Sequence, residues 1–379
     1  MSNYQQIVPI ANKITKKYNL CDHCLGRLFS KQLHLSSNKL LGKKLNQNST
    51  EKCYVCKNLF KNINYFLKLM LDKSTNYSFK TFSVGSLIKP SIVDRDDFIR
   101  SQYKLRGIDS IKTDITKEIG KLYSKKTKKI IDPLDPDITF TLNFKDESCE
   151  LRSKSITLSG RYVKSERGFS QKQKPCDNCS GKGCRVCDFH GIAKYDSVEG
   201  VISKLVFQKF GGTTAKFTWI GGEDKSSLVL GNGRPFFVKI QNPRKRNVRL
   251  SNFDIDSLKI NQLKSVYESP KKPLKFNSVI SVKISAKSQI DSKSLKKLKD
   301  LTISPVILYE KSGKRSEKKI FDVKSKKNSK NMFTLVIKAE GGLPIKRFVI
   351  GDGIVPGIST ILDTPCECGK FDFLEVEIQ

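Results

Sequence analysis

Two adjacent acids, Glu223 and Asp224, stand in "GGEDKSSLVLGNGRPF" (221–236), a turn-forming stretch that follows a strand-like segment. A carboxylate held on such a turn can act as a nucleophile, a general base or an electrostatic stabiliser. From the spacing alone, an exposed acidic turn is the favoured interpretation. The sequence shows no Ser/His/Asp set, no Walker loop and no dinucleotide-binding glycine fingerprint, so Asp224 is the main candidate for a reaction.

Eight of the 11 cysteines form four C-x-x-C pairs, a spacing typical of zinc ligands. "CDHC" and "CYVC" can close one site from two knuckles, whereas "CDNCSGKGCRVC" is a compact quartet with glycines that allow tight turns. Four thiolates leave no open coordination position, so we expect structural zinc. Separate buried thiols are the alternative, and no βαβ pattern supports a thioredoxin-type role. The predicted ligands are Cys21, Cys24, Cys53, Cys56, Cys176, Cys179, Cys184 and Cys187.

The charge balance indicates a polyanionic partner. Lys and Arg number 71 against 37 Asp and Glu, which gives a formal net charge of +34. Nucleic acid is the leading candidate because such an excess attracts phosphates over the whole surface. An anionic membrane surface and a basic surface selected for solubility are the alternatives.

No run of about 18 apolar residues occurs, so the sequence predicts no membrane span. The start, "MSNYQQIVPIANKITKKYNL", lacks the features of a signal peptide. We therefore expect an intracellular, cytoplasmic protein, in which cysteine pairs indicate metal more than disulfides. Nothing in the sequence requires more than a monomer.

The first 152 residues divide into two segments of different type. Residues 1–75 place apolar residues at helical spacing, as in "IVPIANKI". Residues 76–152 contain alternating, strand-like stretches around a helical stretch at 109–126, for which Asp109 is the expected N-cap. The second segment is therefore predicted to be an α+β unit.

The remainder predicts a large mixed domain. Residues 153–195 are rich in Gly, Lys and Cys and are predicted to form a connector. Several alternating stretches beyond it predict strands, and residues 253–267 and 291–301 are predicted to be helical. The expected fold class is α+β throughout.

Several ordered stretches together resemble one known family. They are "LCDHCLGRLFS" (20–30) with "CYVC", "DSIKTDITKEIGKLYSKK…DPLDPDITFTLNF", "LSGRYVKSERGFSQ" (158–171), "CDNCSGKGCRVC…YDSVEGVI", "AKFTWIGGED" (215–224), "LGNGRPFFVKIQNPRKR" (230–246) and "GGLPIKRFVIGD" (341–352). In order and spacing they resemble the archaeal and eukaryotic "ten"-type tRNA pseudouridine synthases.

The resemblance implies an architecture and a partner. Residues 1–75 would form a helical segment with a Cys₄ zinc site, and residues 76–152 a THUMP-type RNA-binding domain. Residues 153–379 would form a pseudouridine synthase domain with a central antiparallel sheet and a Cys-rich insertion at 176–187. The partner would be tRNA.

The resemblance also implies a reaction, isomerisation of uridine 55, with uridine 54 as a further candidate, in the TΨC loop. Asp224 would be the nucleophile that breaks the N1–C1′ bond of a flipped-out uridine, after which the uracil rotates and rejoins through C5. No redox cofactor or catalytic metal is needed. A cation from Lys346 or Arg347 would keep Asp224 ionised. Arg234 would fix the loop or bind a phosphate.

The chain departs from the family pattern at several positions. Gly222 stands where the family has Arg, and "KSS" (225–227) replaces an Asp-containing segment. Phe276 occupies the position of a tyrosine that stacks on the base, so it retains stacking, worth about 1–3 kcal/mol, but cannot transfer a proton. Pro344 replaces an aromatic residue. These changes suggest altered site preference or reduced activity.

Two other functions therefore stay open. The first is a catalytically inactive tRNA-binding protein or tRNA chaperone of the same family. The second is a THUMP-linked enzyme of other chemistry, such as tRNA thiolation, which would require a nucleotide-binding loop and a reactive cysteine pair.

The residues predicted to bind RNA are Phe276, Pro344, Lys346, Arg347 and Arg234.

Overall fold

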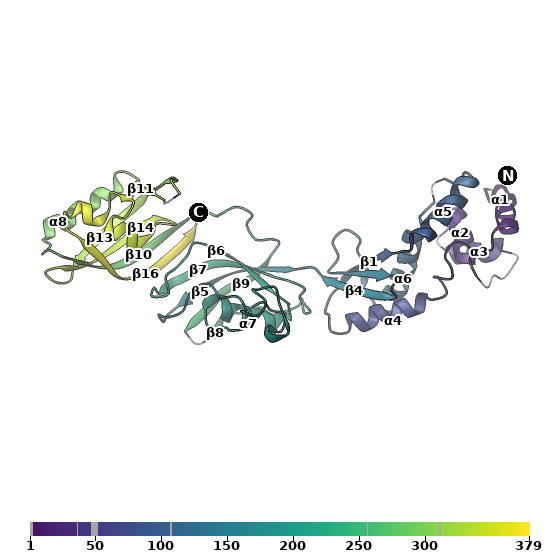
Figure 1. Ribbon diagram of the computed structural model, residues 1–379, viewed down its shortest axis with the longest axis horizontal. Coiled ribbons are helices and arrows are strands. Elements are labelled where there is room, and N and C mark those ends of the chain that lie inside the picture. Colours follow the sequence, from purple (N-terminus) through teal and green to yellow (C-terminus); the bar gives the residue numbers. More distant parts are fainter. Residues whose placement is uncertain (1–2, 36, 47–51, 107, 256, 311) are drawn as a thin grey trace. The chain divides into compact units, whose positions relative to one another are not determined.

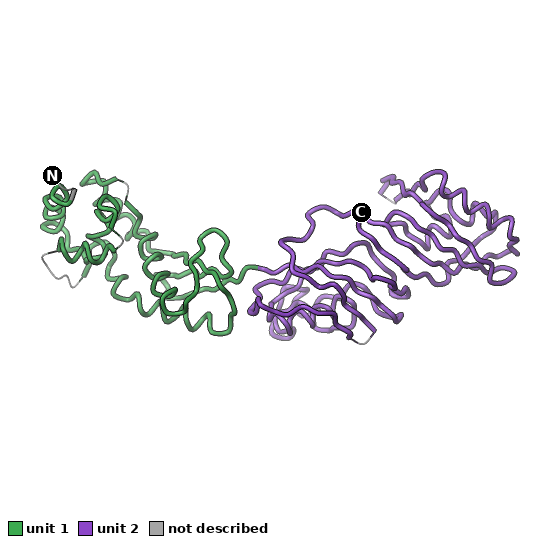
Figure 2. The backbone as a smooth tube through the Cα atoms, turned by 180° about the vertical axis from the view of Figure 1, so that it is seen from behind, with its two compact units in different colours: residues 1–154 green, residues 155–379 purple. Residues whose placement is uncertain are grey.

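The computed structural model describes residues 3–35, 37–46, 52–106, 108–255, 257–310 and 312–379. The chain forms two compact units, residues 1–154 and 155–379 (Figure 2), and each encloses its own hydrophobic core. Both units combine helices with sheets, so the predicted α+β class is confirmed. Among the described residues, no helix has the length and apolar character needed to cross a membrane.

Helices and a four-stranded sheet make up the first unit, with strand order β2-β1-β3-β4. Its elements are α1 (Asn3–Lys17), α2 (Asp22–Ser30), α3 (Asn38–Leu45), α4 (Ile63–Ser74), β1 (Thr81–Leu87), α5 (Pro90–Gln102), α6 (Ile111–Thr127), β2 (Ile130–Ile131), β3 (Ile138–Asn143) and β4 (Ser148–Ser153). The segments 1–75 and 76–152 contribute to one shared core, and a domain boundary between them stays a prediction.

Helix α6 confirms the predicted helical stretch but corrects its N-cap. The Oγ atom of Ser110 accepts a hydrogen bond from the amide of Thr113 at 3.2 Å. The carboxylate of Asp109 instead pairs with Lys117 at 2.6 Å. Serine and aspartate are both favoured N-caps, so the sequence alone offered two adjacent candidates.

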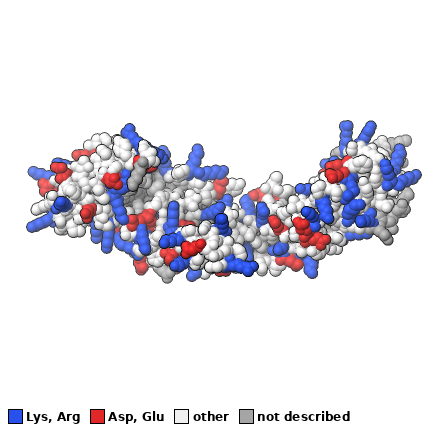
Figure 3. All heavy atoms as spheres, viewed as in Figure 1, with Lys and Arg blue, Asp and Glu red and all other residues white. Residues whose placement is uncertain are grey.

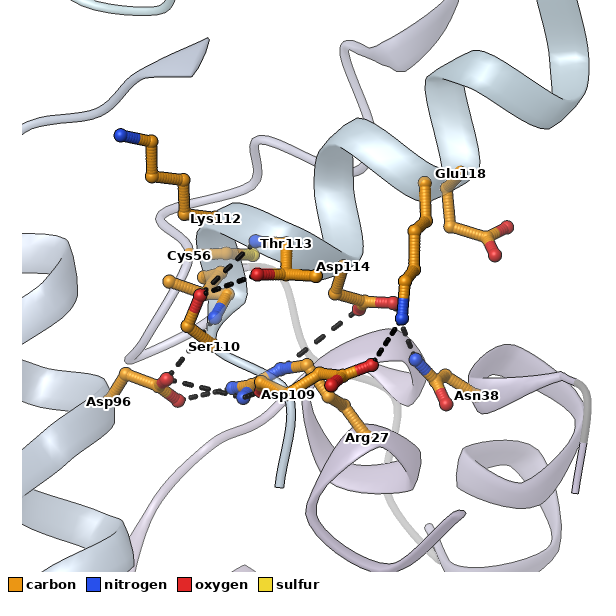
Figure 4. A network of polar contacts seen from close by, with 12 residues as sticks. Arg27, Asn38, Cys56, Asp96, Asp109, Ser110, Lys112, Thr113, Asp114 and Glu118 are labelled. Atoms are coloured by element: carbon orange, nitrogen blue, oxygen red, sulfur yellow. Dashed lines mark hydrogen bonds and ion pairs between the residues drawn. The ribbon is translucent and has the colours of Figure 1, made fainter. Parts of the chain in front are cut away.

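A buried arginine connects three helices of the first unit (Figure 4). The side chain of Arg27, on α2, is only 1% exposed and forms an ion pair with Asp96 on α5. Its Nη1 atom donates to the backbone oxygen of Asp109 at 2.7 Å, and its Nε atom lies 4.0 Å from Asp114 on α6. Burial is the main cause that raises the pKa of Asp114 to about 6, and Arg27 opposes this rise. One guanidinium therefore holds three segments together.

We expect Arg27→Met to destabilise the first unit by about 3–5 kcal/mol, because Asp96 would remain buried without its cation. Amide hydrogen exchange of α2 and α6, followed by mass spectrometry, measures this loss. The control is Arg152→Met, which removes an exposed ion pair with Glu150 and should cost no more than about 1 kcal/mol. Equal protection in the two variants would contradict the structural role of Arg27.

The second unit contains a nine-stranded and a three-stranded sheet. Its elements are β5 (Ile156–Lys164), η1 (Arg185–Cys187), α7 (Val198–Phe210), β6 (Ala215–Trp219), β7 (Val229–Ile240), β8 (Phe253–Ile255), β9 (Leu258–Val266), β10 (Phe276–Ala286), α8 (Ser292–Lys297), η2 (Leu298–Thr302), β11 (Val306–Tyr309), β12 (Arg315–Lys318), β13 (Ile320–Lys327), β14 (Met332–Glu340), α9 (Ile345–Ile350), β15 (Ile354–Val355), α10 (Ile358–Ile361) and β16 (Cys366–Ile378).

The large sheet has the order β13-β14-β10-β16-β7-β5-β9-β8, and β6 also pairs with β7. Helix α7 lies by the half that contains β5 to β9, whereas α8 lies by the other half (Figure 1). Helix α9 packs against β16. Strand β16 joins the halves. It pairs with β10 along most of its length but with β7 at one residue pair, Phe373 with Val229.

Two sequence predictions for this unit are wrong. Part of the predicted connector, residues 153–195, is the strand β5, which pairs with both β7 and β9. The predicted helix at 253–267 is the hairpin β8–β9, in which burial alternates at Leu258 and Ile260. Pairing with distant strands decided both cases, and local spacing does not report it.

Candidate active site

Asp224 lies in the loop that connects β6 to β7. Its Oδ1 atom accepts hydrogen bonds from the amide of Ser226 at 2.8 Å and from the Ser226 hydroxyl at 2.7 Å. The hydroxyl of Ser227 donates to the backbone oxygen of Asp224, also at 2.8 Å. The two serines of "KSS" therefore close an Asx-type turn that orients the carboxylate.

Lys346, on α9, completes the environment of this carboxylate. Its Nζ atom lies 2.8 Å from Oδ2 of Asp224. The hydrogen bond from Lys346, followed by those from Ser226, holds the pKa of Asp224 well below its usual range. The lowered pKa keeps Asp224 ionised at neutral pH. Its side chain is 32% exposed, so it is also accessible to a ligand.

Glu223 points the other way, into a fully buried charge cluster. Its carboxylate lies 2.9 Å from Nζ of Lys164 and 3.6 Å from Nε of Arg234, and all three side chains are 0% exposed. Lys164 also donates to the backbone oxygens of Phe169 and Asp224, at 3.0 and 3.3 Å. The cluster therefore anchors the backbone at Asp224 itself.

Arg234 was expected to fix the loop or to bind a phosphate, and its geometry fits the first role. Its Nη1 atom donates to the backbone oxygen of Ile220 at 2.8 Å. Its guanidinium lies over the ring of Phe373, 4.2 Å from the ring centroid. A side chain that is completely buried in this way has no face to offer to a phosphate.

A second clamp, which the sequence did not indicate, holds the far end of the loop. Arg167 forms a two-pronged ion pair with Asp372 on β16, at 2.6 and 2.8 Å, and donates to the backbone oxygen of Ser226. Asp372 also accepts from the amide of Leu228 at 2.9 Å. The two partners are 205 residues apart, so no local motif could connect them.

Phe276, at the start of β10, lies next to the same loop. A methyl group built on Gly221 would come within 2.5 Å of its Cζ atom, and one built on Gly341 within 2.2 Å. Only glycine leaves room for the ring at these two points. The amide of Gly341 also donates to the backbone oxygen of Phe276 at 2.7 Å. Because Gly221 belongs to the loop that carries Asp224, the ring lies beside that loop.

The other predicted site residues are not all brought together. Pro344 is the N-cap of α9, two residues before Lys346. Arg347 turns away from Asp224 and donates to the backbone oxygens of Asp352 and Tyr309, at 3.0 and 2.9 Å. Of the two cations suggested for Asp224, the structure therefore pairs Lys346 with it.

Both cysteine quartets have the geometry of tetrahedral thiolate sites. Within each quartet the sulfur atoms lie within 4.8 Å of one another. The Cys21–Cys56 sulfur distance is 3.7 Å, and the distances from Cys187 to Cys179 and to Cys184 are 3.9 and 3.8 Å. A metal–sulfur length of about 2.3 Å implies sulfur–sulfur edges of about 3.8 Å in a tetrahedron. The predicted ligands therefore fit a metal ion.

Hydrogen bonds to sulfur favour thiolates in the second quartet. The amides of Gly183 and Gly191 donate to Cys179 and Cys187, at 3.2 and 3.3 Å. A side-chain hydrogen bond from Asn178 is the main cause that lowers the pKa of Cys184 to about 6. Deprotonated sulfur is the form that binds metal.

Taken together, the fold and site define a two-unit α+β protein that presents an ionised, lysine-paired aspartate beside an aromatic ring. Residues 66–143 match the family model "Pus10 THUMP domain, archaeal", and residues 157–377 match "Pus10, C-terminal". The chain belongs to the Pus10 family.

Curated relatives agree with this assignment over nearly the whole chain. The protein "tRNA pseudouridine synthase Pus10" of Nitrosopumilus maritimus is 66% identical over 381 residues and covers 100% of both chains. The protein of the same name from Cenarchaeum symbiosum is 34% identical and covers 96% of this chain and 90% of its own. That of Pyrococcus furiosus is 28% identical and covers 98% of each.

We expect Glu223→Gln to destabilise the second unit by about 3–5 kcal/mol, because two buried cations would lose the carboxylate that both contact. Thermal unfolding followed by the fluorescence of Trp219, the single tryptophan, which lies on β6, measures this change. The control is Glu377→Gln, whose carboxylate is 52% exposed beside Arg161 and should matter by no more than about 1 kcal/mol. A wild-type unfolding temperature for Glu223→Gln would refute the anchoring role.

Proposed function

We propose that the protein is a tRNA pseudouridine synthase that isomerises uridine 55, with uridine 54 as a further candidate, in the TΨC loop. The observation that carries the proposal is the Asp224–Lys346 ion pair at 2.8 Å, on a loop anchored at both ends and next to an aromatic ring. Membership of the Pus10 family, and the names of the relatives, support the same reaction.

The geometry suits each step of such an isomerisation. Because its pKa is held low, Asp224 is ionised and can attack the flipped-out nucleotide without first losing a proton. Attack of the carboxylate at C1′ would break the N1–C1′ bond. The uracil then rotates, and C5 bonds to C1′ as the Asp224–C1′ bond breaks, while the C5 proton leaves and N1 gains one. Phe276 offers a face on which the base can stack. It has no hydroxyl, so the C5 proton must pass to Asp224 or to water.

The surface charge supports tRNA as the substrate. Lys and Arg side chains are spread over the visible faces of both units, whereas Asp and Glu are fewer (Figure 3). Each phosphate that these cations neutralise releases counterions, so binding should weaken steeply with salt. The THUMP-type unit would contribute RNA contacts of its own.

We further propose that both quartets bind zinc. Four thiolates and no open position would make each ion structural, so the reaction itself needs no metal or redox cofactor. Such sites contribute to folding, since the ligands are brought together only in the folded chain.

Metal analysis of the purified protein should find about two zinc ions per chain. The double variant Cys184→Ser/Cys187→Ser should retain one, because only the second quartet is broken. The matched control, Cys149→Ser/Cys366→Ser, should retain both, since these cysteines lie outside the quartets. A wild-type content below one would exclude the two-site proposal.

The reaction is tested by incubating unmodified tRNA with the protein and mapping pseudouridine by carbodiimide-dependent primer stops. We expect a stop at position 55 with the wild type and none with Asp224→Asn, which keeps the size of the side chain but removes its charge. Asp322→Asn, at an exposed ion pair with Lys324, is the control and should behave like the wild type. Stops of equal strength with Asp224→Asn would refute its role as the nucleophile.

The second candidate is a catalytically inactive tRNA-binding protein or chaperone. It is favoured by the phenylalanine at position 276, which lacks a group for proton transfer, and by Gly222 and Pro344. A wild-type protein that binds tRNA but produces no stop would establish this candidate in place of the enzyme.

A further inference from the structure

A cavity of about 370 Å³ lies beside the Asp224 loop. Its walls come from three stretches of chain: residues 168–177, residues 193–196 and Lys225. Lys225 directly follows Asp224, and its backbone oxygen accepts a hydrogen bond from the amide of Gly168 at 3.0 Å. The cavity therefore shares a wall with the loop that carries the proposed nucleophile.

The charged side chains that line the cavity are three lysines and two aspartates. Lys174, Lys194 and Lys225 form no ion pair within 4.0 Å with any other described residue. Asp196 accepts a hydrogen bond from Gln173 at 2.8 Å, and Asp177 is the second acid. The excess of one positive charge matches the single negative charge of a phosphodiester.

The second cysteine quartet connects two of these walls. The first wall extends to Asp177, between the first two cysteines of the quartet; the chain then passes through the rest of the quartet and returns to the cavity at Ala193 and Lys194. At the base of this excursion the amide of Cys176 donates to the backbone oxygen of Gly191 at 2.8 Å. A metal ion held by the four sulfurs would fix the ends of the excursion, and with them the two lysines.

The floor of the cavity is held independently. Ser170 forms a parallel β-bridge with Ser197, and the amide of Val198 donates to the backbone oxygen of Ser170 at 3.0 Å. Gly168 has a φ of +104°, and a methyl group built on it would meet nothing within 4 Å. The backbone there faces open space that a ligand can enter.

We propose that this cavity binds one backbone phosphate of the RNA strand next to the nucleotide at Asp224, and that the metal-bound second quartet holds Lys174 and Lys194 in place for it. This proposal rests on the proposed function for the choice of RNA as the ligand. It gives the Cys-rich insertion a part in substrate binding, beyond support of the fold.

The test measures binding of unmodified tRNA by fluorescence anisotropy at several salt concentrations. Lys174→Ala/Lys194→Ala should bind several-fold more weakly, and the slope of log affinity against log salt should become shallower by about one, as expected for one lost phosphate contact. The control is Lys296→Ala/Lys299→Ala, which removes two lysines of α8 and η2 in the same unit. The proposal is overturned if the two variants bind alike.

A second arm tests the role of the quartet. Cys184→Ser/Cys187→Ser should weaken binding to a similar extent, and adding the two lysine substitutions should weaken it little further, because both changes act on one contact. Trp219 fluorescence verifies that the variants remain folded. Fully additive losses would show that the quartet does not act through these lysines.

The outcomes separate this proposal from the proposed function. If the wild type binds tRNA in the expected lysine-dependent way but forms no pseudouridine, the phosphate site stands and the enzyme does not. If pseudouridine forms and the lysine variant binds tRNA as tightly as the wild type, the enzyme stands and the phosphate site does not.

Discussion

The buried contact of Glu223 with Lys164 and Arg234 is the constraint on which the Asp224 loop depends. Removing a carboxylate from water is costly, and close cations must offset that cost. Here they do so at the residue next to the reactive one, so the backbone of Asp224 cannot move without breaking the cluster. Of these two adjacent carboxylates, Glu223 is the fixed anchor and Asp224 remains partly exposed to solvent.

A buried charge with opposite charges around it also occurs in the first unit. There the central charge is the guanidinium of Arg27, and carboxylates surround it. At the far end of the Asp224 loop, Arg167 and Asp372 form a further ion pair, but their side chains are partly exposed, at 29% and 21%. Several of the 37 acidic residues are thus used in internal contacts. These ion pairs use four cations for four acids, so the net charge of +34 is left on the remainder of the chain, where it attracts a polyanion.

Local features were predictable from the sequence and distant pairings were not. The spacing of Cys176 to Cys187 was sufficient to predict a sulfur cluster, because all four ligands lie within one short excursion. The partnership of Asp224 with Lys346 followed only from the family resemblance. The anchoring role of Glu223 and the Arg167–Asp372 clamp had no signal at all, since each depends on strands that meet only in the folded sheet. For the same reason β5 was read as a connector and β8–β9 as a helix.

The join between the two halves of the large sheet has a mechanical consequence. Strands β16 and β7 are paired at one residue pair. Hydrogen bonds from Arg167 and Leu228 to the side chain of Asp372 on β16 also connect the two halves. Asp224 belongs to the β6–β7 side of this line, whereas Lys346 lies on α9, which packs against β16. The Asp224–Lys346 ion pair therefore spans the join, as do the contacts of Asp372 with Arg167 and Leu228. The ionised state of the aspartate depends on both halves of the sheet being in place.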